Sequence, residues 1–337
     1  MTTTTPPDHP SFPLAKIGVL LVNLGTPDAA EAKAVRRYLA EFLSDRRVVE
    51  IPTLLWKPIL HGIILRTRPS KSAHAYAQVW TKDGSPLAAI THAQADALKD
   101  AFGPDVIVDH AMRYGRPAIG DRLAALKAKG CDRILVAPLY PQYCAATTAT
   151  ANDCAFVALS RMRWQPALRT LPPYYDDSAY IDALASSVRT SLARLDFVPD
   201  QIMASFHGMP QRTLELGDPY HCHCQKTARL LSEALGHELI VAFQSRFGRA
   251  KWLEPATDTT LAALPGKGVK RIAVVAPGFS ADCVETLEEI QIRARETFEA
   301  AGGTHFAYLP CLNDSAEGMA MLRTVIIREL AGWRTLT

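Results

Sequence analysis

Short apolar runs alternate with amphipathic segments along most of the chain. The runs are rich in Val, Ile and Leu and end at glycine, proline or polar residues, which is typical of buried strands in a parallel sheet. The segments between them carry apolar residues at intervals of three and four and predict helices. The predicted strands are residues 16–24, 106–108, 133–137, 167–171, 201–206, 239–243, 271–275 and 306–309. The predicted helices are residues 28–43, 91–102, 117–129, 147–160, 176–195, 282–289 and 315–330. This alternation predicts an α/β fold in which helices cover both faces of parallel sheets.

The pattern restarts near residue 201, and two pairs of segments resemble each other. Residues 107–116 resemble residues 240–249, and residues 133–138 resemble residues 271–277. Such self-similarity indicates an internal duplication. We therefore expect two similar α/β domains with a ligand cleft between them.

The expected domain boundaries follow from this duplication. The N-terminal domain is expected to cover residues 15–160 and 312–337, because the last predicted helix should cross back onto it. The C-terminal domain is expected to cover residues 161–311, and residues 1–14 are expected to be a disordered tail.

Two local features can also be predicted. Asp28 is expected to cap the first helix, with Glu31 three residues later. Residues 76–87 are expected to form a loop, with a turn at Asp83-Gly84.

Composition narrows the class of protein. The chain has 337 residues, of which 48% are hydrophobic and 21% are charged, as in ordinary globular proteins. A net charge of +3 gives no reason to expect a nucleic-acid partner. No secretory signal is recognisable, and no apolar run reaches the roughly 18 residues that a membrane helix needs. We expect a cytoplasmic protein whose seven cysteines are thiols or metal ligands rather than disulfides.

Candidate chemistry lies where two predicted strands end. Asp282, Glu285 and Glu289 follow the strand at 271–275 at spacings that put them on one face of a helix. His207 ends the strand at 201–206, and Gly208 lets the chain turn there. We expect His207 to face Asp282 and Glu285, because ligands bind beyond the carboxyl ends of parallel strands. An imidazole beside a carboxylate can accept protons or bind a divalent transition ion. The competing interpretation is a structural histidine and an acidic first turn that compensates the helix dipole.

Residues 51–65 form a mostly apolar segment that contains two prolines and a Trp56-Lys57 pair. Such pairs are common at interfaces. The segment is too short to span a bilayer. Besides a core segment, it fits an apolar lip beside a ligand site or a contact with a membrane surface.

Several motifs in one order resemble the ferrochelatase family from Lys16 to Trp333. They are Val-Asn-Leu-Gly-Thr-Pro at 22–27, Leu-Tyr-Pro-Gln-Tyr at 139–143, Ser-Phe-His-Gly-Met-Pro at 205–210, Gly-Asp-Pro-Tyr at 217–220, Phe-Gln-Ser-Arg-Phe-Gly at 243–248 and the stretch 274–290. The resemblance implies insertion of ferrous iron into protoporphyrin IX to form protohaem, the last step of haem biosynthesis. It also implies two Rossmann-like domains and a hydrophobic lip at the porphyrin mouth, which residues 51–65 fit.

The resemblance also implies roles for individual residues. The invariant histidine of the family falls on His207 and its key glutamate on Glu285, with Asp282 and Glu289 as an acidic path. His207 would either accept a pyrrole proton or ligate iron. For the anionic propionates of the porphyrin, the motif positions suggest Arg113, Tyr114, Tyr143 and Ser85, and more weakly Arg36 and Arg37.

The cysteines raise the question of a cofactor. Some ferrochelatases carry a [2Fe–2S] cluster on four cysteines, several of them in a C-terminal extension. Cys144 lies within one position of a ligand in such enzymes. A cluster on Cys144, Cys222, Cys224 and one further cysteine is therefore a candidate. Cys283 stands where some relatives have histidine.

Three alternatives stay open at this point. One is a chelatase of the same fold that acts on coproporphyrin III, and another is a chelatase that inserts cobalt. The third is a two-lobed tetrapyrrole-binding protein without catalysis. A homodimer and a peripheral contact with the inner face of the membrane are expected from the resemblance.

Overall fold

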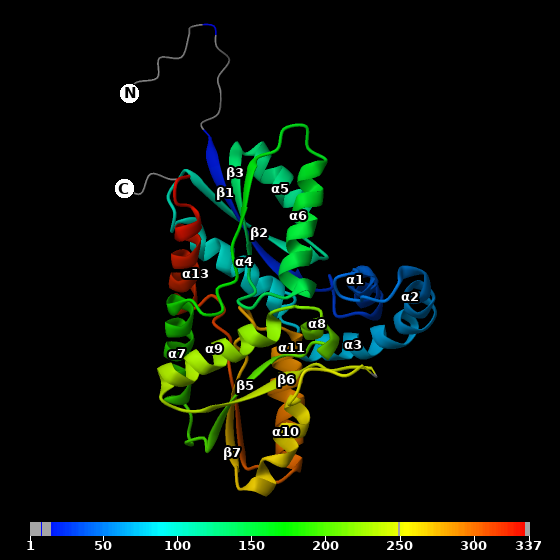
Figure 1. The fold of residues 1–337 in the computed structure, drawn as a ribbon, viewed down its shortest axis with the longest axis vertical. Coiled ribbons are helices and arrows are strands. Elements are labelled where there is room, and N and C mark those ends of the chain that lie inside the picture. Colours follow the sequence, from blue (N-terminus) through cyan, green and yellow to red (C-terminus); the bar gives the residue numbers. More distant parts are fainter. Residues whose placement is uncertain (1–7, 9–14, 249, 334–337) are drawn as a thin grey trace.

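Two four-stranded parallel sheets, each flanked by helices, form the molecule (Figure 1). This computed structural model describes residues 8, 15–248 and 250–333; apart from Asp8, the expected tail lies outside the described residues. The first sheet has the order β2-β1-β3-β4 and the second the order β6-β5-β7-β8. The strands are β1 (Lys16–Gly25), β2 (Val106–Tyr114), β3 (Cys131–Pro138), β4 (Ala167–Thr170), β5 (Gln201–His207), β6 (Leu239–Gln244), β7 (Arg271–Val275) and β8 (His305–Leu309). Both halves therefore follow one topology, as the duplicated motifs predict, and the α/β fold class is confirmed.

Thirteen α-helices are described. They are α1 (Ala32–Ser44), α2 (Thr53–Ile59), α3 (Leu65–Val79), α4 (Pro86–Lys99), α5 (Ile119–Ala128), α6 (Thr150–Ser160), α7 (Ser178–Leu192), α8 (Gln211–Glu215), α9 (Tyr220–Leu235), α10 (Thr257–Ala263), α11 (Val284–Thr286), α12 (Arg295–Ala300) and α13 (Ala316–Glu329). Three π-helical segments, η1 (Leu60–Ile64), η2 (Ala145–Ala149) and η4 (Leu287–Ala294), and the 3-10 turn η3 (Pro265–Lys267) connect some of them.

Two local predictions are wrong. The first helix begins at Ala32 with Glu31 as its N-cap, and Asp28 instead pairs with Arg37 at 3.0 Å. Residues 76–79 belong to α3 rather than to a loop, because Tyr76 packs into the core between α3 and α1.

The central strands are buried on both faces. Residues Val19–Val22 of β1 are fully buried, which explains why that strand reads as a continuous apolar run. Helix α13 packs against α7 and α4. Arg169 of β4 reaches the end of α13 and donates a hydrogen bond of 2.6 Å to the carbonyl of Glu329.

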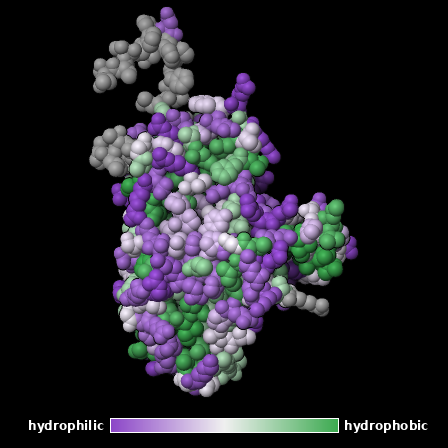
Figure 2. Space-filling model, in the orientation of Figure 1, coloured by the Kyte–Doolittle hydropathy of each residue, from purple (hydrophilic) through white to green (hydrophobic). Residues whose placement is uncertain are grey.

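Segment α2–η1–α3 forms an arm that projects sideways from the first domain (Figure 1). Leu60 and Leu65 anchor it in the core beside α1, whereas Leu54, Leu55 and Ile63 are 88%, 65% and 57% exposed. These side chains form part of the apolar surface at the side of the molecule in Figure 2. Helix α3 of the arm also contacts α11 and η4 of the second domain. Within the described part of the chain, no helix has the length and apolar character required to cross a bilayer.

Candidate active site

His207 is the last residue of β5, a central strand of the second sheet. The next residue must be glycine, because a Cβ on Gly208 would come within 2.5 Å of the carbonyl oxygen of Gln244. The Nδ1 of His207 lies 2.7 Å from the carbonyl oxygen of Gly208. A carbonyl only accepts, so this contact favours the tautomer with the proton on Nδ1. Nε2 is then left with a lone pair that can take a proton or bind a cation.

Glu285 lies in α11, just beyond the end of β7. Its main-chain carbonyl accepts a hydrogen bond of 2.7 Å from Nε2 of Gln244, whose Oε1 accepts one of 2.8 Å from Ser205. Helix α11, which carries Glu285, contacts α3, which carries Tyr76. Burial, and secondarily the charge of Glu285 among other neighbours, raises the pKa of the Tyr38 and Tyr76 phenols. Glu285 therefore lies where the two domains meet.

Glu289 lies one turn further along the same helical segment. Its Oε2 accepts a hydrogen bond of 2.5 Å from Ser245, and its Oε1 lies 3.3 Å from the guanidinium of Arg293. Burial and then repulsion by Glu285 raise the pKa of Glu289, while Ser245, His207 and Arg293 act in the opposite direction. Gln244 links His207 to Glu285: it pairs with His207 in the sheet and bonds the main chain of Glu285. In the described ranges, no three His, Cys, Asp or Glu side chains are grouped so that they could hold a metal ion.

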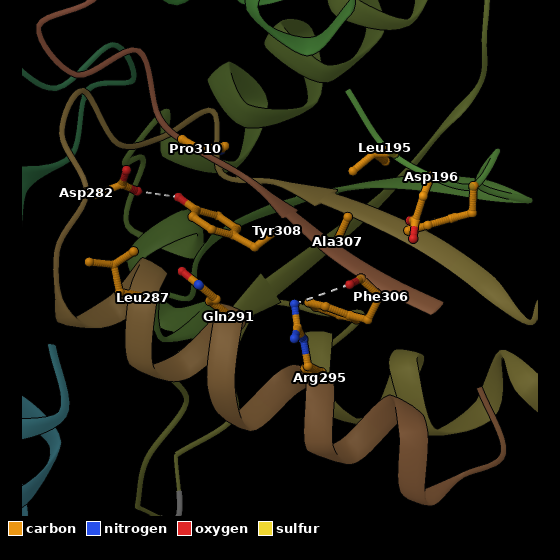
Figure 3. Close-up of a pocket in the computed structure, with 11 residues that line it drawn as sticks. Leu195, Asp196, Asp282, Leu287, Gln291, Arg295, Phe306, Ala307, Tyr308 and Pro310 are labelled. Atoms are coloured by element: carbon orange, nitrogen blue, oxygen red, sulfur yellow. Dashed lines mark hydrogen bonds between the residues drawn. The ribbon is translucent and has the colours of Figure 1, made fainter. Parts of the chain in front are cut away.

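Asp282 is held away from the helical face that the sequence predicts, because the helix begins only at Val284. Its Oδ1 accepts hydrogen bonds from Thr286 at 2.9 Å and Tyr308 at 2.5 Å. Its Oδ2 accepts one from Asn313 at 2.7 Å. Asp282 lines a cavity of about 350 Å³ between β8 and η4, where its carboxylate points to Tyr308 (Figure 3). Through these bonds Asp282 stabilises the structure at the edge of the second sheet.

The first two candidates for propionate binding are Arg113 and Tyr114. Both bond the carboxylate of Asp45, a residue that no sequence pattern indicates. The guanidinium of Arg113 pairs with Asp45 at 2.5 Å and its Nε bonds Oγ1 of Thr150 at 2.6 Å. Tyr114 is fully buried and donates to Asp45 at 2.8 Å. Burial acts to raise the pKa of Asp45, but these hydrogen bonds and the charge of Arg113 outweigh it, so the pKa is lowered. Both side chains are therefore committed to bonds within the protein.

The other two candidates lie in different surroundings. Ser85 is buried at the N-terminus of α4. Tyr143 is half-buried, and its main-chain N–H donates to Nδ1 of His223 at 3.1 Å.

The cysteines do not fit an iron–sulfur cluster. Cys222 and Cys224 are two residues apart on α9, so they point to different sides of the helix. Cys222 is exposed, whereas Cys224 and Cys144 are buried. Burial raises the pKa of the Cys144 and Cys224 thiols, which favours the thiol over the thiolate that such a cluster needs.

Sequence similarity points to one family. A family model described as Ferrochelatase matches residues 16–330. The chain belongs to the ferrochelatase family. It is 59% identical over 333 residues to the ferrochelatase of Rhizobium meliloti strain 1021, covering 97% of this chain and 98% of the relative. It is 55% identical over 337 residues to the ferrochelatase of Agrobacterium fabrum strain C58, covering 97% of each chain.

Solved structures support the fold. SirB from Bacillus subtilis, solved with Fe3+, superposes with a TM-score of 0.55 at 14% identity, covering 94% of this chain and 96% of that one. DR2241 from Deinococcus radiodurans, described as similar to chelatases, gives a TM-score of 0.52 at 13% identity over 96% of this chain and 56% of that one. At these identities the likeness concerns the two-domain fold alone.

Membership of the ferrochelatase family makes the chain an enzyme, a metal chelatase of the lyase class. Ferrochelatases insert ferrous iron into a porphyrin in haem biosynthesis, with iron as a substrate, and this is the activity of the chain. The alternative of a binding protein without catalysis is therefore rejected.

Proposed function

We propose that His207 and Glu285 carry out the insertion of ferrous iron into protoporphyrin IX. The observation that supports this most is that Gln244 pairs with His207 in the sheet and bonds the main chain of Glu285, so both residues lie beside the same strand end. Iron enters the ring only when two pyrrole protons leave, so the reaction needs basic groups close to the ring nitrogens. An imidazole and carboxylates provide them, and the same atoms are acceptable ligands for ferrous iron in transit.

The surroundings of each residue support a different role in the reaction. Nε2 of His207 accepts the first pyrrole proton, because Nδ1 is engaged with the carbonyl of Gly208. Glu285, fixed through its main chain by Gln244, is the carboxylate that works together with His207. The raised pKa of Glu289 brings its proton affinity closer to neutral pH, as a general base requires. Glu289 then passes protons on, and Asp282 holds the loop before α11.

The porphyrin enters beside the arm. The exposed apolar side chains at residues 54, 55, 59 and 63 of the arm, with Ile51 just before it, form a surface that fits both an apolar macrocycle and the surface of a bilayer. We propose that the protein is cytoplasmic and that the arm also makes a peripheral contact with the inner face of the membrane.

Tyr143 and Ser85 stay predictions as contacts of the porphyrin propionates, whereas Arg113 and Tyr114 would first have to break their bonds with Asp45. The homodimer expected from the resemblance stays a prediction that light scattering checks.

One experiment tests the substrate. The protein is mixed anaerobically with ferrous iron and protoporphyrin IX, and the absorbance of the metalloporphyrin is followed. The same assay with coproporphyrin III, and with cobalt in place of iron, tests the two alternative chelatases. We expect the highest kcat/KM with protoporphyrin IX and ferrous iron. A higher kcat/KM for either alternative contradicts the proposal on substrate and leaves the family assignment intact.

A further inference from the structure

Arg68 of α3 crosses from the arm to the second domain. Its guanidinium lies 5.0 Å from the centre of the Phe247 ring, in the loop that follows β6. Burial lowers the pKa of Arg68, and the charge of Glu289 acts against that decrease. Among the described residues the Arg68 side chain makes no hydrogen bond or ion pair. The guanidinium of Arg68 thus contacts the second domain on the ring of Phe247.

The loop that receives Arg68 is tied to the proposed catalytic residues in two ways. Ser245, two residues before Phe247, has a φ of +65° and donates its hydroxyl hydrogen bond to Glu289. Phe247 packs against Trp252, with ring centres 5.0 Å apart, and its carbonyl accepts a hydrogen bond of 2.9 Å from the indole of Trp252. Figure 1 shows this loop, in yellow, running beneath α3.

Trp252 packs between Phe247 and Gly208, the residue next to His207. Its Cε3 lies 3.3 Å from the position that a Cβ on Gly208 would take, so the indole packs closely on that glycine. The carbonyl of Gly208 is the group that bonds Nδ1 of His207. Packed contacts therefore run from Arg68 through Phe247 and Trp252 to the peptide that orients the His207 imidazole.

We propose that Arg68 is a positioning residue: by stacking on Phe247 it couples the closed position of the arm to the orientation of His207 and Glu289. This inference rests on the proposed roles of His207 and Glu289. When the arm lies against the second domain, Arg68 holds the loop that supports both side chains. When the arm moves away to admit a porphyrin, the loop loses that support. The arm thus acts on the orientation of the reacting groups.

Arginine suits this position better than lysine. A planar, weakly hydrated guanidinium can stack on an aromatic ring in a half-buried site, whereas an ammonium is a compact, strongly hydrated charge. A cation on a ring is worth on the order of 1 kcal/mol at a partly exposed site, which corresponds to about a fivefold change in an equilibrium.

The first test measures hydrogen exchange in peptides that cover residues 243–253, without substrate. We expect Arg68→Ala to speed exchange in this loop by about two- to fivefold, and Arg68→Lys to do so nearly as much. The matched control is Arg66→Ala, an exposed arginine on the same helix, which should leave the loop unchanged. Equal exchange in wild type and Arg68→Ala would overturn the proposal, whatever the enzyme's substrate.

The second test is a double-mutant cycle on iron insertion with Arg68→Ala and Phe247→Leu. Each single variant should lower kcat/KM by about two- to fivefold, with part of the loss in kcat, because His207 is misplaced even when porphyrin is saturating. The double variant should be no worse than the worse single variant. Fully additive losses, or losses confined to KM, contradict the coupling. If His207→Ala retains full activity, the proposed function fails instead, and only the exchange result then bears on the contact between arm and loop.

Discussion

The amide of Gln244 donates a hydrogen bond of 2.7 Å to the main-chain carbonyl of Glu285, and so joins the end of β6 to the start of α11. Gln244 is itself 5% exposed and oriented by Ser205. A side-chain amide thereby fixes the backbone of the proposed catalytic carboxylate, rather than the carboxylate itself. The carboxyl group of Glu285 takes no part in this bond.

Gln244→Leu should impair catalysis without removing any proposed reacting group. The substitution leaves the carbonyl of Glu285 without its donor, and a displacement of about 1 Å at a reacting group can cost up to about a hundredfold in rate. We expect kcat to fall by about ten- to a hundredfold while the protein stays folded by circular dichroism. Gln225→Leu, at an exposed position on α9, is the control and should retain its kcat. An unchanged kcat in Gln244→Leu would show that the Glu285 backbone needs no such support.

Glu289→Gln should make the protein more stable at neutral pH. The pKa of Glu289 is raised by burial and by Glu285, so the native state binds its proton more tightly than the unfolded chain does. Stability is therefore lost as the pH rises from the unfolded pKa of about 4.3 through the folded pKa. The Tm of Glu289→Gln should exceed that of wild type at pH 7.5 and match it near pH 4. Glu296→Gln, exposed on α12, should show neither effect; a lower Tm for Glu289→Gln at both pH values would contradict the assigned cause.

Asp45→Asn should destabilise the first domain in a pH-dependent way. Asp45 accepts from Tyr114, Thr150 and Arg113, and losing one charge of a largely buried pair costs on the order of 3 kcal/mol. Because the pKa of Asp45 is lowered, this contribution is complete above the unfolded pKa of about 3.9 and is lost as the pH falls through the folded pKa. Urea unfolding at pH 7 should show the full difference from wild type, and the difference should shrink below about pH 4. Asp28→Asn, which breaks an exposed pair, is the control. A difference that stays constant with pH would exclude the charge of Asp45 as its source.

Leu54→Ser combined with Leu55→Ser should weaken binding to lipid vesicles. Both side chains are largely exposed, and each could bury an apolar area worth about 1.5–3 kcal/mol. We expect at least a tenfold loss in partitioning onto vesicles of anionic and zwitterionic lipid, measured by co-sedimentation. Val198→Ser, at a residue 74% exposed and outside the arm, is the control. Equal partitioning of the wild type and the double variant would exclude the arm as the membrane contact.

Periodicity and motif order predict the arrangement of strands well. The apolar runs that end at Gly25, His207 and Val275 are strands buried on both faces, so their pattern is continuous and easily recognised. The shared order of the two sheets follows from the duplicated segments for the same reason.

The sequence could not predict which polar groups bond each other across the fold. Asp282 lies three residues before Glu285, a spacing that predicts one shared helix face. Its carboxylate instead bonds Tyr308 and Asn313, which lie 26 and 31 residues away in the sequence. Asp45 and Arg113 are 68 residues apart, and no local pattern signals their ion pair. The alternation of histidine and cysteine at 221–224 suggests a metal site, but a helix turns alternate residues to different sides.

The roles of His207 and Glu285 are tested most directly by the iron-insertion rates of His207→Ala and Glu285→Ala, measured anaerobically with saturating ferrous iron and porphyrin. Both variants should keep the wild-type circular dichroism spectrum, because His207 and Glu285 are half-buried and lie outside the hydrophobic core clusters. The account predicts that kcat falls by at least about a hundredfold in each, since losing a positioned proton-transfer group costs about 10²–10⁴ in rate. A folded His207→Ala or Glu285→Ala variant that turns over at the wild-type rate would contradict it.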